Sequence, residues 1–260
     1  DENNEELRLT HGRYIDLLKN EDRRVREDAF EGMHGEYEKL ENTFAAVLDS
    51  SVKGDVFYAR ARKYDSALES ALDNDNISTD VYNNLIDTVS DNLEPLHQYM
   101  ELKKELLNLD ELHIYDVYKP LIEDIELKFK YEETKEIIKN AVKPLGQNYI
   151  ETVEKGFNSG WIDVYENKGK RSGAYSSGCY GVHPYILMNY TQDIGNLFTL
   201  IHEMGHAMHS YYSNKNQPYL YADYKIFVAE VASTLNENLL IDYMLENAKS
   251  REENLYLLNY

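Results

Sequence analysis

The chain has only one cysteine, fewer basic than acidic residues, and no long run of apolar residues. Cys179 is its single cysteine, which excludes an internal disulfide framework and suits a reducing compartment. Its 27 basic and 47 acidic residues give a formal net charge of −20, which disfavours nucleic acids and anionic membranes as partners. No run of 18 apolar residues occurs, so no membrane span is predicted. A cytoplasmic protein is therefore expected.

The composition does provide enough apolar material for a folded protein. An apolar content of 42% over 260 residues allows a sizeable core in one large or two small domains. The 23 tyrosines combine an apolar ring with a polar hydroxyl. They suit a cleft that binds peptides, and ordinary packing accounts for them equally well.

Helical spacing of apolar residues dominates residues 1–157. Asn20 is expected to cap a helix that continues to Leu48, and Asp55 is expected to begin a second one. Ser78 should cap a third, long pattern, which Pro95 should kink or split. Two further helices are predicted over 131–142 and 144–157, the second with Pro144 in its first turn.

Between Trp161 and Tyr190 the spacing of apolar residues changes from that of a helix to the alternation of a β-strand. Residues 161–165 alternate and are β-branched, residues 167–170 form a turn signal, and residues 171–175 could return as a strand. Residues 185–190 predict a third strand. We therefore expect a mainly α fold with a small β-sheet at about 161–190. The expected organisation is a helical region, 1–157, followed by 158–260 as the part that carries the chemistry described next.

Residues 202–206 read His-Glu-Met-Gly-His and carry the clearest chemical signal. Positions i and i+4 of a helix lie on one face, so His202 and His206 can direct two imidazoles at one Zn²⁺. Glu203 lies close enough to reach a water on that metal. Zinc lowers the pKa of bound water to about 7, and a carboxylate can then accept its proton. The spacing therefore indicates a hydrolytic mechanism.

The surrounding residues favour a buried helix. Asn196 is expected to be its N-cap. The alternative is two unrelated histidines, one packed in a core and one at the surface. A metal supplies a reason for burying polar groups that would otherwise cost several kcal/mol. The apolar residues with helical spacing are Leu197, Leu200, Ile201, Met204 and Met208.

A catalytic zinc needs a third protein ligand, and Glu230 is the candidate. It lies 24 residues beyond His206 within an apolar run, where an unpaired carboxylate is rarely buried. The alternative is a glutamate on a solvated helix face. Glu237, two turns further on, is expected to orient a ligand histidine through its other ring nitrogen. His209 could act in the same way or face the substrate. One Zn²⁺ per chain is expected.

These residues resemble a known family. His-Glu-Met-Gly-His at 202–206, followed by Phe-Val-Ala-Glu-Val-Ala-Ser-Thr-Leu-Asn-Glu at 227–237, is similar to the oligoendopeptidase F branch of the thimet-oligopeptidase-like zinc metallopeptidases. Residues 55–68, 161–178 and 183–190 also resemble segments of that family. The resemblance implies a helical metallopeptidase fold, with the small sheet beside the zinc-binding helix. It also implies His202, His206 and Glu230 as zinc ligands, Glu203 as general base, and short peptides as substrates.

The resemblance also favours one role for the sheet. An extended substrate can add to a sheet edge through backbone hydrogen bonds, and small residues let another backbone approach. Gly173, Ala174 and Tyr175, with Gly178, are the expected substrate edge. On the residues alone, a surface hairpin with flexible glycines is an equal alternative.

Family members are roughly twice as long as this chain. Beyond the glutamate-bearing helix they carry a His and several Tyr that bind substrate and stabilise the tetrahedral intermediate. Nothing after Glu237 fits that role, and residues 255–260 end within an apolar helical pattern. We therefore expect an internal fragment, with the oxyanion-stabilising residues beyond Tyr260. The missing C-terminal part is expected to pack on the site.

The expected function is zinc-dependent hydrolysis of short peptides by an endopeptidase. One alternative is a zinc carboxypeptidase, in which Lys170 or Arg171 would bind the C-terminal carboxylate of the substrate. An alternative from another class is a helical binding or scaffold module whose His-Glu-x-x-His pattern is fortuitous.

Overall fold

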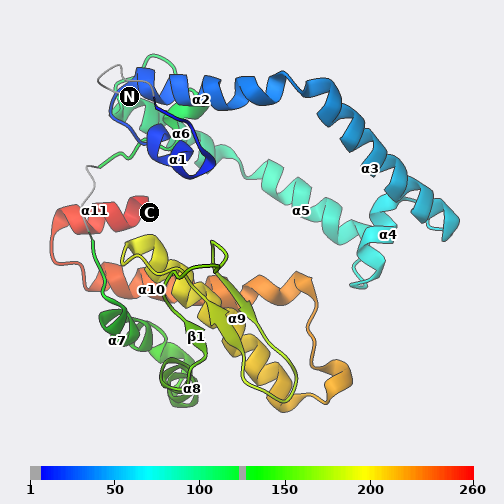
Figure 1. The fold of residues 1–260 in the computed structure, drawn as a ribbon, viewed down its shortest axis with the longest axis vertical. Helices are drawn as coiled ribbons and strands as arrows, with labels where there is room; N and C mark the ends of the chain where they lie inside the picture. The colour runs from blue at the N-terminus through cyan, green and yellow to red at the C-terminus, as the bar shows by residue number, and fades with distance from the viewer. Residues whose placement is uncertain (1–6, 123–126) are drawn as a thin grey trace. The chain divides into compact units, whose positions relative to one another are not determined.

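The structure is a computed structural model, and it describes residues 7–122 and 127–260. The chain divides into two compact units, Asp1–Glu123 and Asp124–Tyr260. The fold is mainly α with a small sheet, as predicted (Figure 1). None of the described helices is long and apolar enough to cross a membrane. The expected division into 1–157 and 158–260 stays a prediction.

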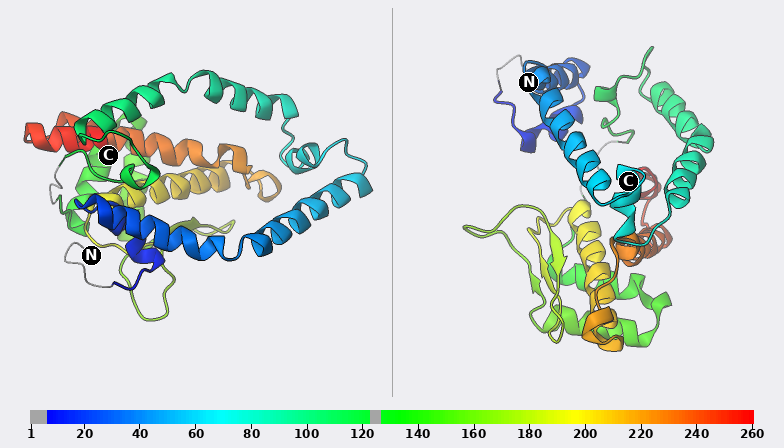
Figure 2. Two further views of the ribbon diagram at one scale, coloured as in Figure 1. Left: turned by 90° about the horizontal axis from the view of Figure 1, so that it is seen from above. Right: turned by 90° about the vertical axis from the view of Figure 1, so that its right-hand side faces the viewer.

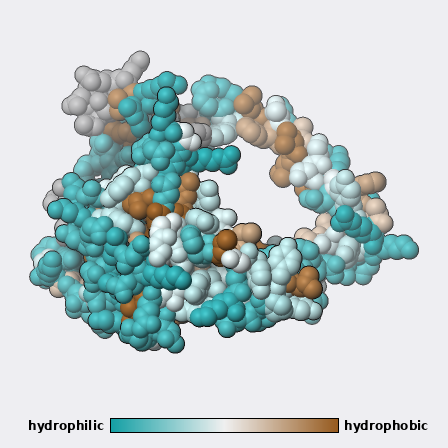
Figure 3. All heavy atoms as spheres, turned by 60° about the horizontal axis from the view of Figure 1, so that its bottom comes forward, coloured by the Kyte–Doolittle hydropathy of each residue, from teal (hydrophilic) through white to brown (hydrophobic). Residues whose placement is uncertain are grey.

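The described part of the first unit is helical. Its helices are α1 (His11–Leu18), α2 (Arg23–Glu38), α3 (Glu41–Ala61), α4 (Ala67–Asp73), α5 (Thr79–Asp91) and α6 (Glu94–Leu106), followed by the 3₁₀ turn η1 (Ile114–Asp116). Many apolar side chains on α3 and α5 are exposed, and Figure 3 shows brown side chains along the arm at its upper right, where α3 lies.

Three expectations for this unit are wrong. Asp22, and not Asn20, caps α2, because its carboxylate accepts a hydrogen bond from the backbone N–H of Arg24. Asp55 lies inside α3 and begins no helix; Lys53 pairs with Asp49 one turn earlier and supports the helix there. The single helix expected up to residue 48 is also interrupted between α2 and α3, where Leu40 has a non-helical backbone.

Two other boundaries agree with the sequence. Ser78 precedes α5, and Pro95 lies in the first turn of α6, so the long pattern is split there. The loss of one backbone N–H at that position costs nothing, because the first N–H groups of a helix have no intrahelical partner.

The described part of the second unit, 127–260, contains two helices, a small sheet and three further helices. The first two helices are α7 (Tyr131–Ala141) and α8 (Gln147–Asn158), and the 3₁₀ turn η2 (Lys143–Leu145) lies between them. Pro144 lies in η2 and not in α8, because Gly146 has a φ of +91° and breaks the helical path before α8 begins. The elements that follow are β1 (Ile162–Asp163), β2 (Tyr175–Ser177), β3 (Tyr185–Leu187), α9 (Ile194–Asn216), η3 (Tyr219–Tyr221), η4 (Ile226–Val228), α10 (Ala229–Glu246) and α11 (Arg251–Asn259).

The sheet has the order β1-β3-β2. β1 pairs with β3 in parallel, with Ile162 opposite Ile186, and β2 pairs with β3 antiparallel, with Ser176 opposite Ile186. The strand expected over 171–175 is wrong. Gly173 has a φ of +87°, which is incompatible with an extended strand, so β2 begins only at Tyr175. β2 is therefore an edge strand.

The core of the second unit lies around α9. The five apolar residues singled out in 197–208 are each at most 1% exposed. Asp193 caps the helix by accepting from the backbone N–H of Asn196 at 2.8 Å, so the predicted cap at Asn196 is wrong. The sheet lies along one side of α9 and α10 along another (Figure 2). This arrangement places β2 and α10 on either side of residues 202–206.

Candidate metal centre

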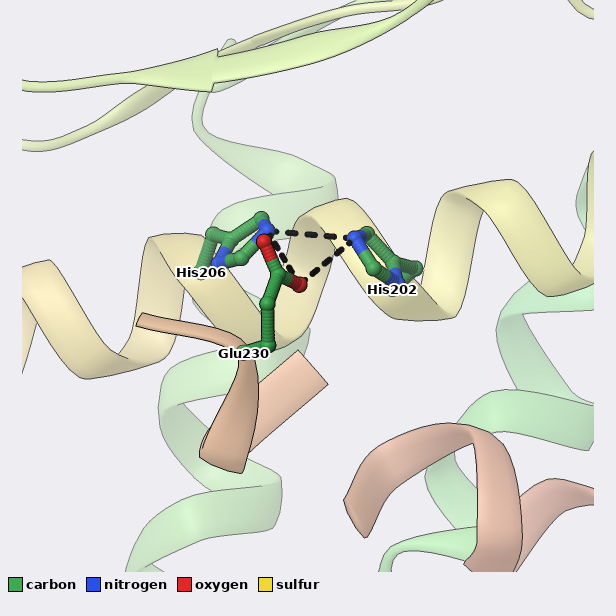
Figure 4. A group of neighbouring side chains, drawn as sticks. All are labelled: His202, His206 and Glu230. Carbon is green, nitrogen blue, oxygen red and sulfur yellow. Dashed lines mark hydrogen bonds and ion pairs between the residues drawn. The ribbon is translucent and has the colours of Figure 1, made fainter. Parts of the chain in front are cut away.

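His202 and His206 project from one face of α9, one turn apart. Their Nε2 atoms are 3.1 Å from each other. Glu230, in the first turn of α10, places its Oε2 atom 3.3 Å from Nε2 of His202 and 3.4 Å from Nε2 of His206. Figure 4 shows the three side chains converging. Among the described residues, these three form the cluster that could hold a metal ion.

The spacing and chemistry of these atoms suit a tetrahedral metal. Zinc bonds of about 2.0 Å to nitrogen or oxygen place neighbouring ligand atoms about 3.3 Å apart. The three separations in the structure, 3.1, 3.3 and 3.4 Å, agree with this distance between neighbouring ligand atoms. Two imidazoles and one carboxylate leave one coordination position for water or substrate, as in catalytic zinc sites. The residues present therefore fit zinc.

Glu237 fixes the orientation of one imidazole. Its Oε1 atom lies 3.0 Å from Nδ1 of His202. A carboxylate accepts hydrogen bonds, so we assign the ring proton to Nδ1, which leaves the Nε2 lone pair free to bind a metal. This contact supports the orienting role predicted for Glu237, which stays a prediction.

Glu230 is held in place by a residue that the sequence reasoning missed. The buried hydroxyl of Ser233 donates to Glu230 Oε2 at 2.7 Å, and this bond lowers the pKa of the carboxyl group. The expectation that Glu230 is buried among apolar neighbours is wrong. Its side chain is 61% exposed, and Val228 and Val231 are exposed as well. Ser233 lies three residues after Glu230 on the same helix, and this spacing could have identified it as the partner of the carboxylate.

Glu203 is buried beside the imidazoles. Burial raises the pKa of its carboxyl group, while His202, His206 and the backbone N–H of Ser176 oppose that shift. The contact with Ser176 ties the carboxylate to the edge strand β2. A carboxylate made less acidic by burial is better suited to accept and return a proton near neutral pH.

α9 and α10 approach very closely beside the cluster. A Cβ atom placed on Gly205 would lie 2.6 Å from Cα of Ser233, so only glycine fits there. The fully buried Asn236 donates to the carbonyl of Ile201 at 3.3 Å and accepts from the hydroxyl of Tyr149 at 3.1 Å. Sequence reasoning missed these contacts, because each joins residues that are distant in the chain. They set the position of α10, and therefore of Glu230, against α9.

Comparison with known proteins decides the family. The chain matches Peptidase family M3 over residues 16–258. The chain belongs to peptidase family M3. It is 50% identical to oligopeptidase PepF of Bacillus subtilis and 43% identical to group B oligopeptidase PepB of Streptococcus agalactiae, over 100% and 98% of its length. The resemblance to oligoendopeptidase F proteins is thus confirmed.

Solved structures of similar proteins agree with this assignment to family M3. A structure from Chlamydophila abortus is 44% identical and superposes with a TM-score of 0.86 over 96% of this chain. Oligoendopeptidase-F from Enterococcus faecium is 37% identical, with a TM-score of 0.69 over the whole chain. The chain spans 39% and 42% of the lengths of the two Bacillus and Streptococcus relatives.

Within this M3 chain, His209 lies outside the metal cluster. Its ring stacks on Tyr224, with centroids 3.6 Å apart and planes 7° apart. Its Nδ1 atom is buried without a hydrogen-bond partner in the described part of the chain, and burial lowers the pKa of the ring. The predicted roles of His209 stay predictions.

The segment predicted as the substrate edge lies at the start of β2. Tyr175 is the first residue of the strand, and Gly173 and Ala174 lead into it. The side chain of Asn189 donates to the carbonyl of Gly173 at 2.8 Å and fixes this approach. Lys170 is a candidate anchor for a substrate carboxylate. Its side chain is only 3% exposed and already pairs with the carboxylate of Asp163.

Proposed function

We propose that the protein is a zinc-dependent endopeptidase that hydrolyses short peptides. The observation that carries this proposal is the convergence of His202, His206 and Glu230 at the separations of a tetrahedral site, with Glu203 buried beside it. Membership of peptidase family M3 supports peptide hydrolysis, and several relatives bear the names oligopeptidase or oligoendopeptidase. A location in the cytoplasm is part of the same proposal.

In this mechanism His202, His206 and Glu230 would hold the zinc. When bound, zinc supplies a Lewis acid for the scissile carbonyl and lowers the pKa of its bound water to about 7. Glu203 accepts the proton of the attacking water and transfers it to the leaving amine. Glu237 keeps the proton of His202 on Nδ1, and Ser233 holds the Glu230 carboxylate in place.

The free edge of β2 is the proposed binding site for the peptide backbone. β3 pairs with one edge of β2, and the other edge has no strand partner among the described residues. The N–H of Ser176 contacts Glu203, so a peptide added to this edge would pass the general base. The proposed edge thus begins at Gly173, Ala174 and Tyr175 and extends to Ser177.

Stabilisation of the oxyanion is proposed to depend on residues outside 1–260. Removal of one donor to an oxyanion typically lowers the rate by about 10²–10³-fold. The isolated 1–260 piece should therefore cleave peptides far more slowly than the full-length protein, even when both contain zinc. Equal kcat/KM values for the two would contradict this part of the proposal.

The test of the proposed function uses the full-length protein and a fluorogenic peptide blocked at both ends. Cleavage should stop when zinc is removed by a chelator and should return when zinc is added. Glu203→Gln should retain zinc and lose turnover by about 10²–10⁴-fold, because an amide cannot accept the proton. Cleavage only of peptides with a free C-terminus would instead indicate a carboxypeptidase. A protein that binds no zinc after dialysis would indicate a binding module.

A further inference from the structure

A cavity lies on α9 beyond the metal cluster. Its volume is about 570 Å³, and it is bounded by the loop that follows β2, by Ser210 on α9 and by the segment 219–224. Ser210 is one helical turn after His206, which corresponds to a rise of about 6 Å along the helix axis. The proposed mechanism uses none of the residues that line this cavity.

The aromatic walls of this cavity are held by contacts around it. The hydroxyl of Tyr224 lies 3.0 Å from Oγ of Ser210, and its ring is stacked on His209. The hydroxyl of Tyr180 donates to the carbonyl of Gln217 at 3.2 Å. The ring of Tyr180 also meets that of Tyr219 edge to face, with centroids 5.4 Å apart. Hydrogen bonds thus hold the rings of Tyr180 and Tyr224 before any ligand enters, which lowers the entropic cost of binding.

The charge of the lining favours a cation. Asp223 contributes one carboxylate, and no lysine, arginine or histidine is among the described residues that line the cavity. The faces of tyrosine rings attract ammonium and guanidinium groups, and a neighbouring carboxylate adds to that attraction. The formal net charge of −20 acts in the same direction at longer range. A lysine or arginine side chain is therefore the best match in chemistry.

The strand β2 connects the cavity to the proposed peptide site. Ser176 contacts Glu203, and a Cβ atom on Gly178 would lie 3.8 Å from Cβ of Ser210. β2 therefore runs along α9 from the general base towards the cavity. Two residues of strand cover about 7 Å. A peptide paired antiparallel to β2, the more stable arrangement, has its N-terminal side towards Gly178.

We propose that this cavity binds a lysine or arginine side chain located two or three residues N-terminal to the scissile bond. The inference rests on the proposed peptidase function and defines its substrate class: short peptides with a basic residue at that place. The selectivity comes from Asp223 and from the rings of Tyr180, Tyr219 and Tyr224.

The test uses the full-length, zinc-loaded protein and peptides blocked at both ends. Lysine, arginine, norleucine or glutamate is placed in turn at each of three positions on either side of the cleaved bond. At the second or third position on the N-terminal side, kcat/KM should be about tenfold higher for lysine than for norleucine. Asp223→Asn should reduce this ratio towards one. The control Asp242→Asn removes an exposed carboxylate from α10, away from the cavity, and should keep the ratio.

Three results would overturn the inference. They are equal kcat/KM for lysine and norleucine at both positions, a lysine preference only on the C-terminal side, and a preference that Asp223→Asn leaves intact. Binding of the same peptides to the zinc-loaded Glu203→Gln variant, followed by fluorescence anisotropy, separates this inference from the peptidase function. Tighter binding of lysine peptides that depends on Asp223, without cleavage by the wild type, would refute the peptidase function alone.

Discussion

Substitution of Gly205 by alanine should damage the metal centre without touching a ligand. The added Cβ atom would lie 2.6 Å from Cα of Ser233 and 2.8 Å from the carbonyl oxygen of Ala232. Both atoms belong to the backbone of α10, so no side chain can rotate to make room. Carbon atoms in ordinary contact are about 3.5–4.0 Å apart. α10 must therefore withdraw from α9 by roughly 1 Å.

A shift of this size reaches the cluster through Ser233. Its hydroxyl holds Glu230 Oε2 at 2.7 Å, and the carboxylate will move with it. Ligand positions in a metal site tolerate only about 0.2 Å of error, so a shift of 1 Å is large. Loss of outer contacts of this kind typically weakens metal affinity by about 10–100-fold. Overpacking should also lower the free energy of unfolding by about 1–3 kcal/mol.

The assay is zinc affinity, measured on the full-length protein by competition with a chelator of known affinity. Gly54→Ala is the matched control, because Gly54 also lies within a helix and a Cβ atom placed on it would have no neighbouring atom within 4 Å. That variant should keep the zinc affinity of the wild type. If Gly205→Ala also bound zinc with wild-type affinity, the close packing of α10 on α9 would have no role in placing Glu230.

Three further predictions concern the same region. Glu237→Ala should weaken zinc binding by about 10–100-fold, measured by the same competition, whereas Glu237→Gln should retain most of the affinity because its amide oxygen still accepts from His202. Removal of zinc should lower the free energy of unfolding, measured with urea, by about 3 kcal/mol relative to protein with free zinc at 100 times Kd. Burial raises the pKa of Tyr149 from 10.0 to about 12, so its neutral phenol contributes stability that is complete below pH 10 and is lost as the pH rises through 12. Unfolding free energy should therefore fall between pH 10 and 12 by on the order of 2 kcal/mol more in the wild type than in Tyr149→Phe; parallel curves would refute this.

The features that sequence predicted well are local. The i, i+4 spacing of His202 and His206 fixes their relation on one helix, whatever the rest of the fold does. Pro95 marked a helix boundary because the restriction it imposes is intrinsic to the residue. The helical spacing of apolar residues around the histidines is also a local pattern, and it correctly predicted a buried helix.

The features that were missed depend on contacts between distant segments. The pairing of β1 with β3 joins residues 24 positions apart, such as Ile162 and Ile186, which no local alternation reveals. The role of Gly205 depends on the backbone of α10. Glu230 does lie beside the histidines, but the expected burial of its side chain is wrong, since that side chain is 61% exposed.

The most direct test of the account is a crystal structure of the full-length protein with zinc, with anomalous differences measured at the zinc edge. One peak should lie among Nε2 of His202, Nε2 of His206 and an oxygen of Glu230, each at about 2.0–2.2 Å. Glu203 should lie beyond bonding distance and face the remaining coordination position. A peak elsewhere, or one that is bonded to Glu203 and not to Glu230, would contradict the assignment of ligands and base.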